Sequence, residues 1–341
     1  MKSSKAAKKS APGKKPKSAA KKAVTKLISK VKKAVTAKKP AKAAKPEPKA
    51  KAGKPEPKKI EAKKKVLTNP FETFMQFWKP KAENFEAGLD KLLAEYPPPD
   101  KNIELYKQGI VEKIHAHMRK EPLTSVIEEQ LMERFQRDRV HKMASIWNMK
   151  PRLTIRINTL KADIKGFGGS EAAKELKIRR TALSPWSYEI GKPEAAFTSP
   201  AYERGVFEFQ DEASQIVSLF VNARAGQRIL DLAAGDGSNA LALSAMMRNK
   251  GSIFIYETDA RKLRSFKEKA QRAGVENFRI LTDSQISEVK SLDSVLVHAP
   301  SSRIGELGLH PDLRWRVSKE ELPRVQKLQA ALIREGARKL K

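Results

Sequence analysis

A glycine turn between an apolar run and a helix-forming segment constrains the fold of this chain more than any other feature. The apolar residues Ile229, Leu230 and Leu232 come first, AAGDG follows at residues 233–237, and the helix-forming LALSAMM comes next. A strand that ends in a small-residue turn and opens a helix is how doubly wound sheets bring backbone N–H groups to a nucleotide-like ligand. Two glycines alone are a weak signal, so the flanking sequence decides their meaning.

The alternation of strand and helix continues after this turn. Residues 252–256, 278–281 and 294–297 are predicted strands. Glu257 follows the first of them, Asp283 follows the second, and Asp231 lies at the end of the strand before the turn. Ligands of doubly wound sheets bind beyond the carboxyl ends of the strands, where one carboxylate can hold ribose hydroxyls and another an adenine amino group. Three acidic residues at successive strand ends therefore predict a nucleotide-like site.

Charge is distributed very unevenly along the 341 residues, which carry a net charge of +31. Residues 1–65 contain 25 lysines, no arginine and three glutamates, a net charge of +22, which leaves +9 for the remainder. This Lys/Ala/Pro segment lacks the apolar residues needed for a core, so we expect a disordered tail that attaches to nucleic acid phosphates. A solubilising spacer without a dedicated partner is the alternative. The composition resembles that of linker-histone tails.

Several classes of site and location are disfavoured by composition. The chain has no cysteine, which excludes disulfides, thiolate metal sites and a cysteine nucleophile within it. No window of about 20 uncharged apolar residues is present, so no membrane span is expected. His115, His117 and His141 do not form a recognisable metal-ligand pattern, and we predict no metal site. A cytoplasmic protein is the expected default.

Two regions separate the tail from the nucleotide-like core. Residues 66–150 show helical spacing of apolar residues, including one expected helix over residues 124–147. Residues 151–204 change to strand, helix, strand, strand, which predicts a small α+β domain. Its basic and amide side chains suit contacts with RNA, although an ordinary solvated sheet edge is an equal alternative on this segment alone.

Collinear motifs resemble the Sun family of RNA cytosine-5 methyltransferases, which includes a bacterial small-subunit rRNA enzyme. The motifs are TIRINTLK (154–161), GVFEFQDEASQ (205–215), LDLAAGDG (230–237), ETDARKL (257–263), QRAGVENF (271–278), and HAPSS with HPDLRW (298–315). The resemblance covers roughly residues 127–341 and implies a Rossmann-like core that binds S-adenosylmethionine, preceded by an RNA-binding domain.

Residue roles follow from this resemblance by position. The cofactor-binding residues it implies are Asp231, Ala233, Gly235, Gly237, Glu257 and Asp283. The RNA-binding residues it implies are Arg156, Asn158, Lys161, Gln210 and Asp211.

The chain departs from the family pattern where catalysis is expected. Asn239 replaces the lysine of the cofactor turn, and His298, Ser301 and Arg303 stand where the family has Asp-Ala-Pro-Cys-Ser-Gly. Family enzymes attack cytosine C6 with a cysteine of a later Thr-Cys-Ser motif. Residue 341 precedes that motif and the last strands of such a sheet, so a truncated gene product is one alternative. Serine is a much weaker nucleophile than a thiolate. A His298–Ser301 pair stays open, but we expect a degenerate loop and no confident catalytic residue.

The sequence thus predicts an α/β protein with a class I methyltransferase core and a C-terminally truncated sheet. Expected boundaries are a disordered tail (1–65), a helical region (66–150), a small α+β RNA-binding domain (151–204) and the methyltransferase-like core (205–341). We expect a monomer that binds S-adenosylmethionine and RNA, with rRNA as the first candidate and DNA a second partner for the tail. Methylation of cytosine C5 is in doubt. A non-enzymatic nucleic-acid-binding or ribosome-assembly factor on the same scaffold is the alternative.

Overall fold

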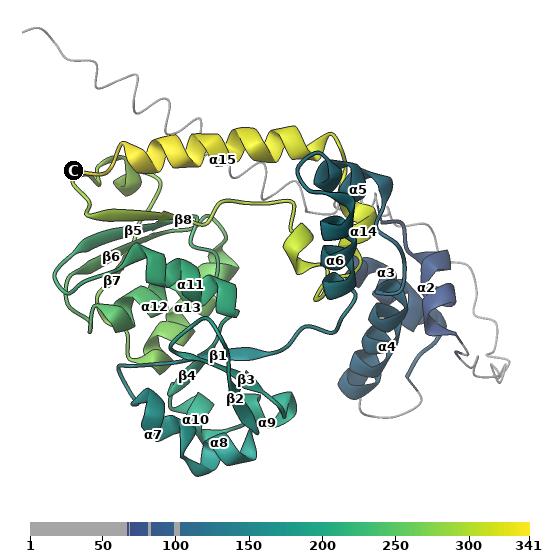
Figure 1. The fold of residues 1–341 in the computed structure, drawn as a ribbon, viewed down its shortest axis with the longest axis horizontal. Helices are drawn as coiled ribbons and strands as arrows, with labels where there is room; N and C mark the ends of the chain where they lie inside the picture. The colour runs from purple at the N-terminus through teal and green to yellow at the C-terminus, as the bar shows by residue number, and fades with distance from the viewer. Residues whose placement is uncertain (1–66, 68, 81–82, 99–102) are drawn as a thin grey trace, which may run out of the picture. The chain divides into compact units, whose positions relative to one another are not determined.

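The computed structural model describes residue 67 and residues 69–80, 83–98 and 103–341 (Figure 1). The predicted tail over residues 1–65 lies outside these residues. The described chain forms two compact units, which are treated separately below. One contains residues 218–298 and 334–341, and the other contains the described residues up to 217 together with 299–333.

A parallel four-stranded sheet is the centre of the first unit. Its strands are β5 (Arg228–Leu232), β6 (Ser252–Tyr256), β7 (Phe278–Ile280) and β8 (Ser294–Val297). Their order is β7-β6-β5-β8, and Leu230 lies between Phe254 of β6 and Val295 of β8. Strand order reverses between β5 and β8, because β6 and β7 extend the sheet on one side and β8 on the other. Such a switch point is where doubly wound sheets bind ligands.

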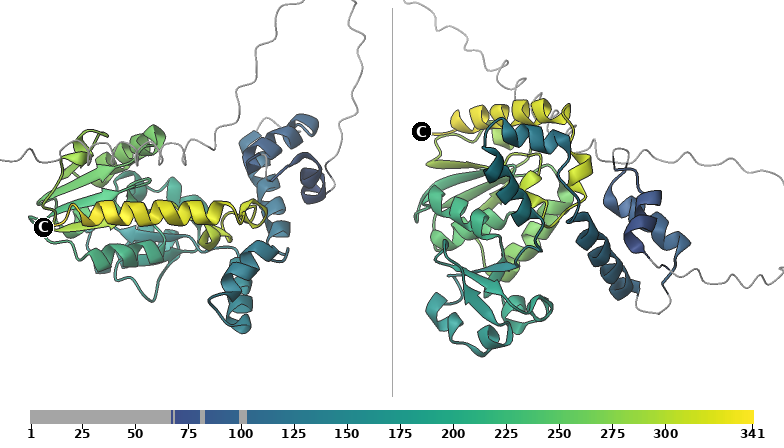
Figure 2. Two further views of the ribbon diagram at one scale, coloured as in Figure 1. Left: turned by 90° about the horizontal axis from the view of Figure 1, so that it is seen from above. Right: turned by 45° about the vertical axis from the view of Figure 1, so that its right-hand side comes forward.

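Helices cover opposite faces of this sheet, as the side-chain alternation of strands requires. Phe266 of α13 (Ala260–Ala273) packs on Phe278, which shares a face with Ile253. Gly336 of α15 (Glu321–Ala337) approaches Val295 and Val297 on the other face. Figure 2 shows α15 as one continuous helix, and α12 (Ser238–Met246) connects β5 to β6. Four of the five residues of β5 and four of the five of β6 are buried, which fits strands covered on both faces.

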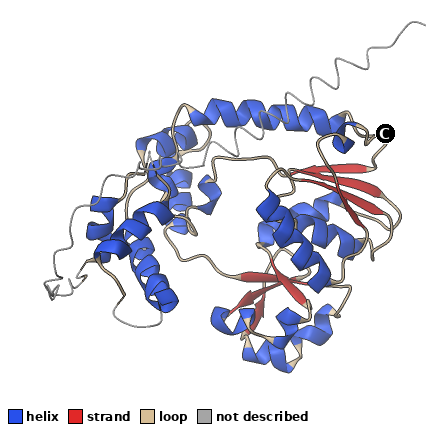
Figure 3. Cartoon of the chain, turned by 180° about the vertical axis from the view of Figure 1, so that it is seen from behind, coloured by secondary structure: helices blue, strands red, loops and turns tan. Residues whose placement is uncertain are grey.

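An antiparallel four-stranded sheet lies in the second unit. Its strands are β1 (Thr154–Ile157), β2 (Ile178–Arg180), β3 (Ser187–Ile190) and β4 (Phe207–Phe209), in the order β2-β3-β1-β4. Figure 3 draws the strands of both sheets in red. The short helices α7 (Ile164–Gly168), α8 (Glu171–Glu175), α9 (Pro193–Phe197) and α10 (Pro200–Glu203) accompany it. The predicted strand, helix, strand, strand order is present. The boundary expected at residue 204 is not a structural one, because β4 pairs with β1 through Ile155 and Phe209.

Five helices precede this sheet among the residues that the structure describes. They are α2 (Pro70–Phe77), α3 (Phe85–Glu95), α4 (Ile103–Met118), α5 (Ser125–Met132) and α6 (Arg137–Trp147). The single helix expected over residues 124–147 is therefore wrong: Gln136 is extended and begins a new helix. The break allows Ile127 of α5 and Trp147 of α6 to pack into one cluster with Leu307 and Leu313.

The remaining described elements are short, apart from α11 (Glu212–Val221). They are the 3-10 turns Gln285–Ser287 and Ile304–Glu306 and the helix α14 (Leu313–Arg316). A helix long and apolar enough to cross a membrane does not occur among the described residues.

Phe207 and Phe220 provide a matched test of the antiparallel sheet's core. Phe207 is fully buried among apolar residues of this sheet, whereas Phe220 is 85% exposed on α11. We expect Phe207→Ala to lower the free energy of unfolding by about 3–5 kcal/mol, because it leaves a cavity. Phe220→Ala should change it by less than about 0.5 kcal/mol. Urea unfolding followed by circular dichroism measures both, and equal losses would contradict the assigned burial.

Candidate cofactor site

The turn after β5 has a backbone that few residues can adopt. Ala233, Gly235 and Gly237 have φ values of +61°, +63° and +74°. A left-handed conformation costs a residue with a Cβ roughly 1–2 kcal/mol, so Ala233 is strained. A Cβ on Gly237 would lie 2.1 Å from the Phe266 ring of α13, which makes glycine necessary there. The turn therefore fits closely against α13, and local strain of this kind concentrates at ligand sites.

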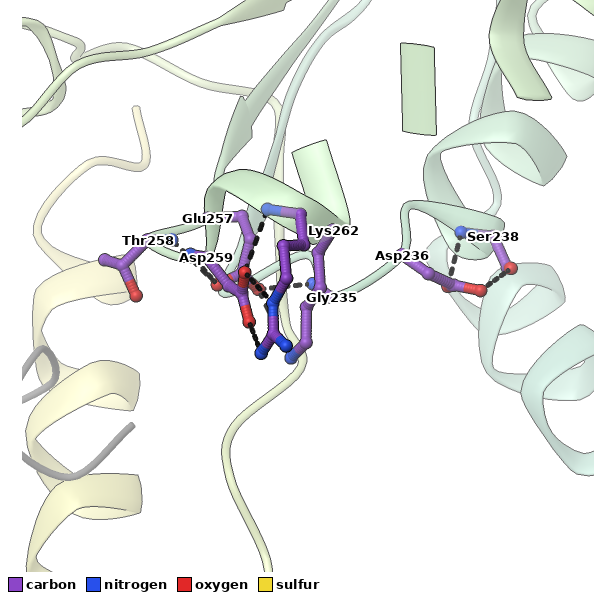
Figure 4. Close-up of polar contacts among 8 residues, drawn as sticks. Gly235, Asp236, Ser238, Glu257, Thr258, Asp259 and Lys262 are labelled. Atoms are coloured by element: carbon purple, nitrogen blue, oxygen red, sulfur yellow. Dashed lines mark hydrogen bonds and ion pairs between the residues drawn. The ribbon is translucent and has the colours of Figure 1, made fainter. Parts of the chain in front are cut away.

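Glu257 connects the end of β6 to this turn (Figure 4). Its Oε2 accepts a hydrogen bond of 2.8 Å from the Gly235 N–H. Its Oε1 accepts from the N–H groups of Thr258 and Asp259 at 2.7 and 2.9 Å. Lys262 Nζ lies 3.9 Å from Oε2, and the Glu257 side chain is almost fully buried. One carboxylate thus fixes the glycine turn relative to the neighbouring strand.

Asp236, inside the turn, links it to two helices. Its Oδ1 accepts from the Ser238 N–H at 3.1 Å, and its Oδ2 accepts from the Ser238 hydroxyl at 2.9 Å (Figure 4). Lys269 of α13 donates to the same Oδ2 at 2.6 Å. The start of α12 and the middle of α13 are therefore held by one side chain that the sequence analysis did not assign. In the sequence, the only indication of this role of Asp236 is its position between Gly235 and Gly237.

Asp231 is a buried carboxylate behind the turn. It is 0% exposed, and neither oxygen makes a hydrogen bond of ordinary geometry with the described residues. Burial, followed by the negative charges of Asp236 and Glu257, raises the pKa of Asp231 to about 7, and the Ala240 N–H offsets part of the rise. A cation placed near this group would relieve both the burial cost and the repulsion.

Asp283 lies near the same end of the sheet. It is exposed and accepts a hydrogen bond of 3.1 Å from the hydroxyl of Tyr256, the last residue of β6. Burial and the adjacent Asp283 raise the pKa of Tyr256, so the hydroxyl keeps its proton and donates. The predicted cofactor residues Asp231, Ala233, Gly235, Gly237, Glu257 and Asp283 are all at the carboxyl ends of β5, β6 and β7 or just beyond them.

His298 follows β8, across the switch point from the turn. Its N–H donates to the Leu232 carbonyl at 3.0 Å. The ring lies 3.6 Å from the position that a Cβ on Gly235 would take, so the imidazole lies beside the glycine turn.

Ser301, in the other unit, contacts the residues that follow it. Its hydroxyl accepts a hydrogen bond of 3.1 Å from the Arg303 N–H, and the Arg303 side chain donates to Glu306. A role of His298 or Ser301 in catalysis stays a prediction.

Three of the predicted RNA-binding side chains are not available at the surface. Arg156 and Asn158 are 2% exposed and Gln210 is 5% exposed. Arg156 Nε donates to Gln210 Oε1 at 2.7 Å, and Asn158 Nδ2 donates to the Gly205 carbonyl at 2.9 Å. Burial lowers the pKa of Arg156 to about 10, still well above neutral, and Glu208 opposes the change. These groups hold the sheet together.

The other two predicted RNA-binding residues are exposed. Lys161 donates to the Arg204 carbonyl at 2.9 Å, and Asp211 accepts from the Ala213 N–H at 2.8 Å at the start of α11. Sequence reasoning missed Gln215, which is fully buried and donates to the Gln210 carbonyl and the Ser187 hydroxyl. The Ser187 contact could not have been predicted from local sequence, because Ser187 lies in β3, 28 positions earlier in the chain. The part of the chain described contains no cluster of three or more potential metal ligands.

Comparison with known proteins places this site in a family. A profile described as 16S rRNA methyltransferase RsmB/F matches residues 218–341. Over these residues the chain is similar to the RsmB/F family. This confirms the resemblance to the Sun-type RNA cytosine-5 methyltransferases.

Relatives of this family match more than half of the chain at low identity. The probable ribosomal RNA small subunit methyltransferase B of Bacillus subtilis is 26% identical over 58% of this chain and 45% of its own length. The ribosomal RNA small subunit methyltransferase F of Serratia proteamaculans is 29% identical over 53% of this chain and 40% of its own. The chain thus spans about half the length of the curated relatives it matches or less.

Solved structures share the fold. The crystal structure of PH0851 has a TM-score of 0.61 at 24% identity, covering 75% of this chain and 60% of that one. The structure of NSun6 from Pyrococcus horikoshii with SFG has a TM-score of 0.55 at 17% identity, covering 64% and 80%. These similarities support the α/β fold of this chain.

Asp231 predicts an unusual dependence of stability on pH. An aspartate in the unfolded chain has a pKa near 3.9. With a folded pKa of about 7, the folded protein keeps a proton that the unfolded chain has lost between about pH 4 and 7, so this residue lowers stability as the pH rises through that window.

We therefore expect Asp231→Asn to flatten this part of the profile. Between pH 5 and pH 8 its free energy of unfolding should fall by about 2 kcal/mol less than that of the wild type. Urea unfolding at both pH values measures this difference. Asp283→Asn, at an exposed carboxylate, is the control. Parallel profiles for wild type and Asp231→Asn would show that the buried carboxylate does not titrate in this window.

Proposed function

We propose that this protein binds RNA and S-adenosylmethionine on an RsmB/F-type fold and does not methylate cytosine at C5. The observation that carries the cofactor half is the buried carboxylate of Asp231 behind a glycine turn, with Glu257 and Asp283 toward the ends of the next strands. Orphaned buried carboxylate oxygens are costly, and a cationic ligand is the simplest group that would stabilise them.

The residues present suit each part of this cofactor. S-adenosylmethionine carries an ammonium and a sulfonium, which fit a site with excess negative charge around Asp231. Glu257 can still accept a hydrogen bond from a ribose hydroxyl. A carboxylate offers about four acceptor positions, and the chain's own N–H groups occupy three of them. Asp283 can accept from an adenine amino group. The bound cofactor would supply an electrophilic methyl group.

Cytosine C5 chemistry lacks a suitable group within this chain. C5 becomes nucleophilic only after covalent addition at C6, and a thiolate is the group able to add near neutral pH. The chain contains no cysteine. Ser301 is exposed, and a serine needs an activating base to act as a nucleophile. Because the chain spans about half of its relatives or less, their activity is not transferred to it.

The RNA half of the proposal rests on charge and on family. The net charge of +31 favours polyanions in general, and family members named for small-subunit rRNA make rRNA the first candidate. Lys161 remains a candidate RNA contact, because its side chain is exposed. A DNA partner for residues 1–65, a monomeric state and a cytoplasmic location stay predictions.

One observation favours a second candidate function, a non-enzymatic RNA-binding factor that does not use the cofactor. Both oxygens of Glu257 already accept hydrogen bonds from the chain itself, and the side chain is 6% exposed. A ribose would have to compete with, or add to, these bonds. In this alternative the glycine turn is a structural feature only.

Calorimetry with S-adenosylmethionine separates the two functions. The first predicts binding by the wild type, with affinity reduced about tenfold or more in Glu257→Gln and Asp283→Asn, because each variant loses a charged acceptor. Glu276→Gln, at an exposed glutamate after α13, is the matched control. Thermal unfolding checks that the variants are folded. Absence of any binding by the folded wild type would favour the second function.

Catalysis is tested by methyl transfer to total rRNA. We expect no 5-methylcytosine above background when wild-type protein is incubated with rRNA and tritium-labelled S-adenosylmethionine. A family member that has both cysteines serves as the positive control. Robust formation of 5-methylcytosine by this chain would overturn the catalytic part of the proposal, whereas other methylated nucleosides would leave it standing.

A further inference from the structure

Helix α13 (Ala260–Ala273) has a high density of positive charge. It has a single acidic residue, Glu268, and a net charge of +5 over its 14 residues. Its six basic residues are Arg261, Lys262, Arg264, Lys267, Lys269 and Arg272. By comparison α15, which is longer, carries a net charge of +1. Like charges on adjacent turns destabilise a helix, so this composition has a cost in the free protein.

The buried face of α13 determines which cations face solvent. Phe266, Ala270 and Ala273 are 0–1% exposed and form one stripe at helical spacing. The opposite side therefore points outward, and Arg261, Arg264 and Lys267 are exposed there. Residues three apart on a helix surface lie about 5–6 Å from each other. Glu268, one turn after Arg264, is exposed on the same side. Arg261, Arg264 and Lys267 are the cations of this outer face of α13.

Internal ion pairs use the cations nearest the cofactor turn but leave the outer face largely uncompensated. Lys269 pairs with Asp236 at 2.6 Å, and Lys262 lies 3.9 Å from Glu257. Arg261 pairs with Asp259 at 3.2 Å near the start of the helix. No ion pair of Arg264 or Lys267 occurs within the described part of the chain.

We propose that the outer face of α13, through Arg264 and Lys267 with Arg261 beside them, binds backbone phosphates of RNA. This inference rests on the RNA-binding half of the proposed function and assigns it a surface in the methyltransferase-like unit, separate from the lysine-rich tail. Phosphates bound there would relieve the repulsion among the cations and release condensed counterions. Backbone phosphates carry no sequence information, so this contact would position the RNA without selecting a base.

The position of α13 connects this contact to the cofactor turn. Phe266 occupies the space beside Gly237, and Lys269 holds Asp236. RNA bound to the outer face of α13 would therefore contact the same helix that packs against the glycine turn on its other side.

Protection of single lysines from acetylation tests the contact directly and independently of the tail. The full-length protein is acetylated with and without a mixed-sequence single-stranded RNA oligonucleotide, and modified lysines are quantified by mass spectrometry. We expect Lys267 to become at least threefold less reactive with RNA. Lys327, an exposed lysine of α15, should change by less than 1.5-fold. Equal protection of both lysines, or of neither, would overturn the proposal.

Salt dependence of binding provides the second measurement, with a matched pair of variants. The test variant is Arg264→Glu with Lys267→Glu, and the control is Arg324→Glu with Lys327→Glu, which has the same residue types and spacing on α15. Two lost phosphate contacts should reduce the slope of log K against log salt by about 1.4 for single-stranded RNA. The control should retain the wild-type slope.

The outcomes distinguish this inference from the proposed function. If the wild type binds RNA and both variants keep its slope, α13 is not the contact, but RNA binding stands. If the wild type binds no RNA, the RNA half of the proposed function fails as well. If duplex DNA protects Lys267 from acetylation and RNA does not, the inferred partner is wrong. Thermal unfolding of the test variant, compared with the wild type, checks that the unit remains folded.

Discussion

The hydrogen bond from the Gly235 N–H to the Glu257 carboxylate is the interaction on which the candidate site depends. Residues 22 positions apart meet because β5 and β6 are parallel and in register, so both strands end at the same edge. The bond holds a turn whose backbone is otherwise strained at Ala233. Without it, the glycine turn and the acidic end of β6 would be two separate loop features.

Negative charge accumulates around this bond. The pKa of Asp231 rises to about 7 because of burial and because the charges of Asp236 and Glu257 act on it. Lysines of α13 compensate the outer carboxylates: Lys269 binds Asp236, and Lys262 lies near Glu257. Within the described ranges Asp231 has no lysine partner, and this difference favours a cationic ligand beside it. The same helix then presents its remaining cations to solvent.

The polar residues of the antiparallel sheet show where prediction from local sequence fails. Arg156, Asn158 and Gln210 have the chemistry of RNA contacts, and nothing in their neighbours suggests burial. Pairing of β1 with β4 brings Arg156 opposite Glu208, and Gln210 accepts from Arg156. Burial of these groups is therefore a property of strand pairing across about 50 residues. The break between α5 and α6 has a similar origin, because a cluster with Leu307 and Leu313 decides it without a proline or glycine.

The sequence by itself determined the order of strands and helices around the parallel sheet, the glycine turn, the acidic residues after the strands and the absence of a thiol nucleophile within the chain. These features are local, since they depend on apolar periodicity, on residue type and on composition. Only the tertiary structure decided which polar groups are buried, that β4 joins the antiparallel sheet, and which cations of α13 are already paired. Those properties depend on contacts between distant segments, and a carboxylate or guanidinium acquires its role from the partners that folding places beside it.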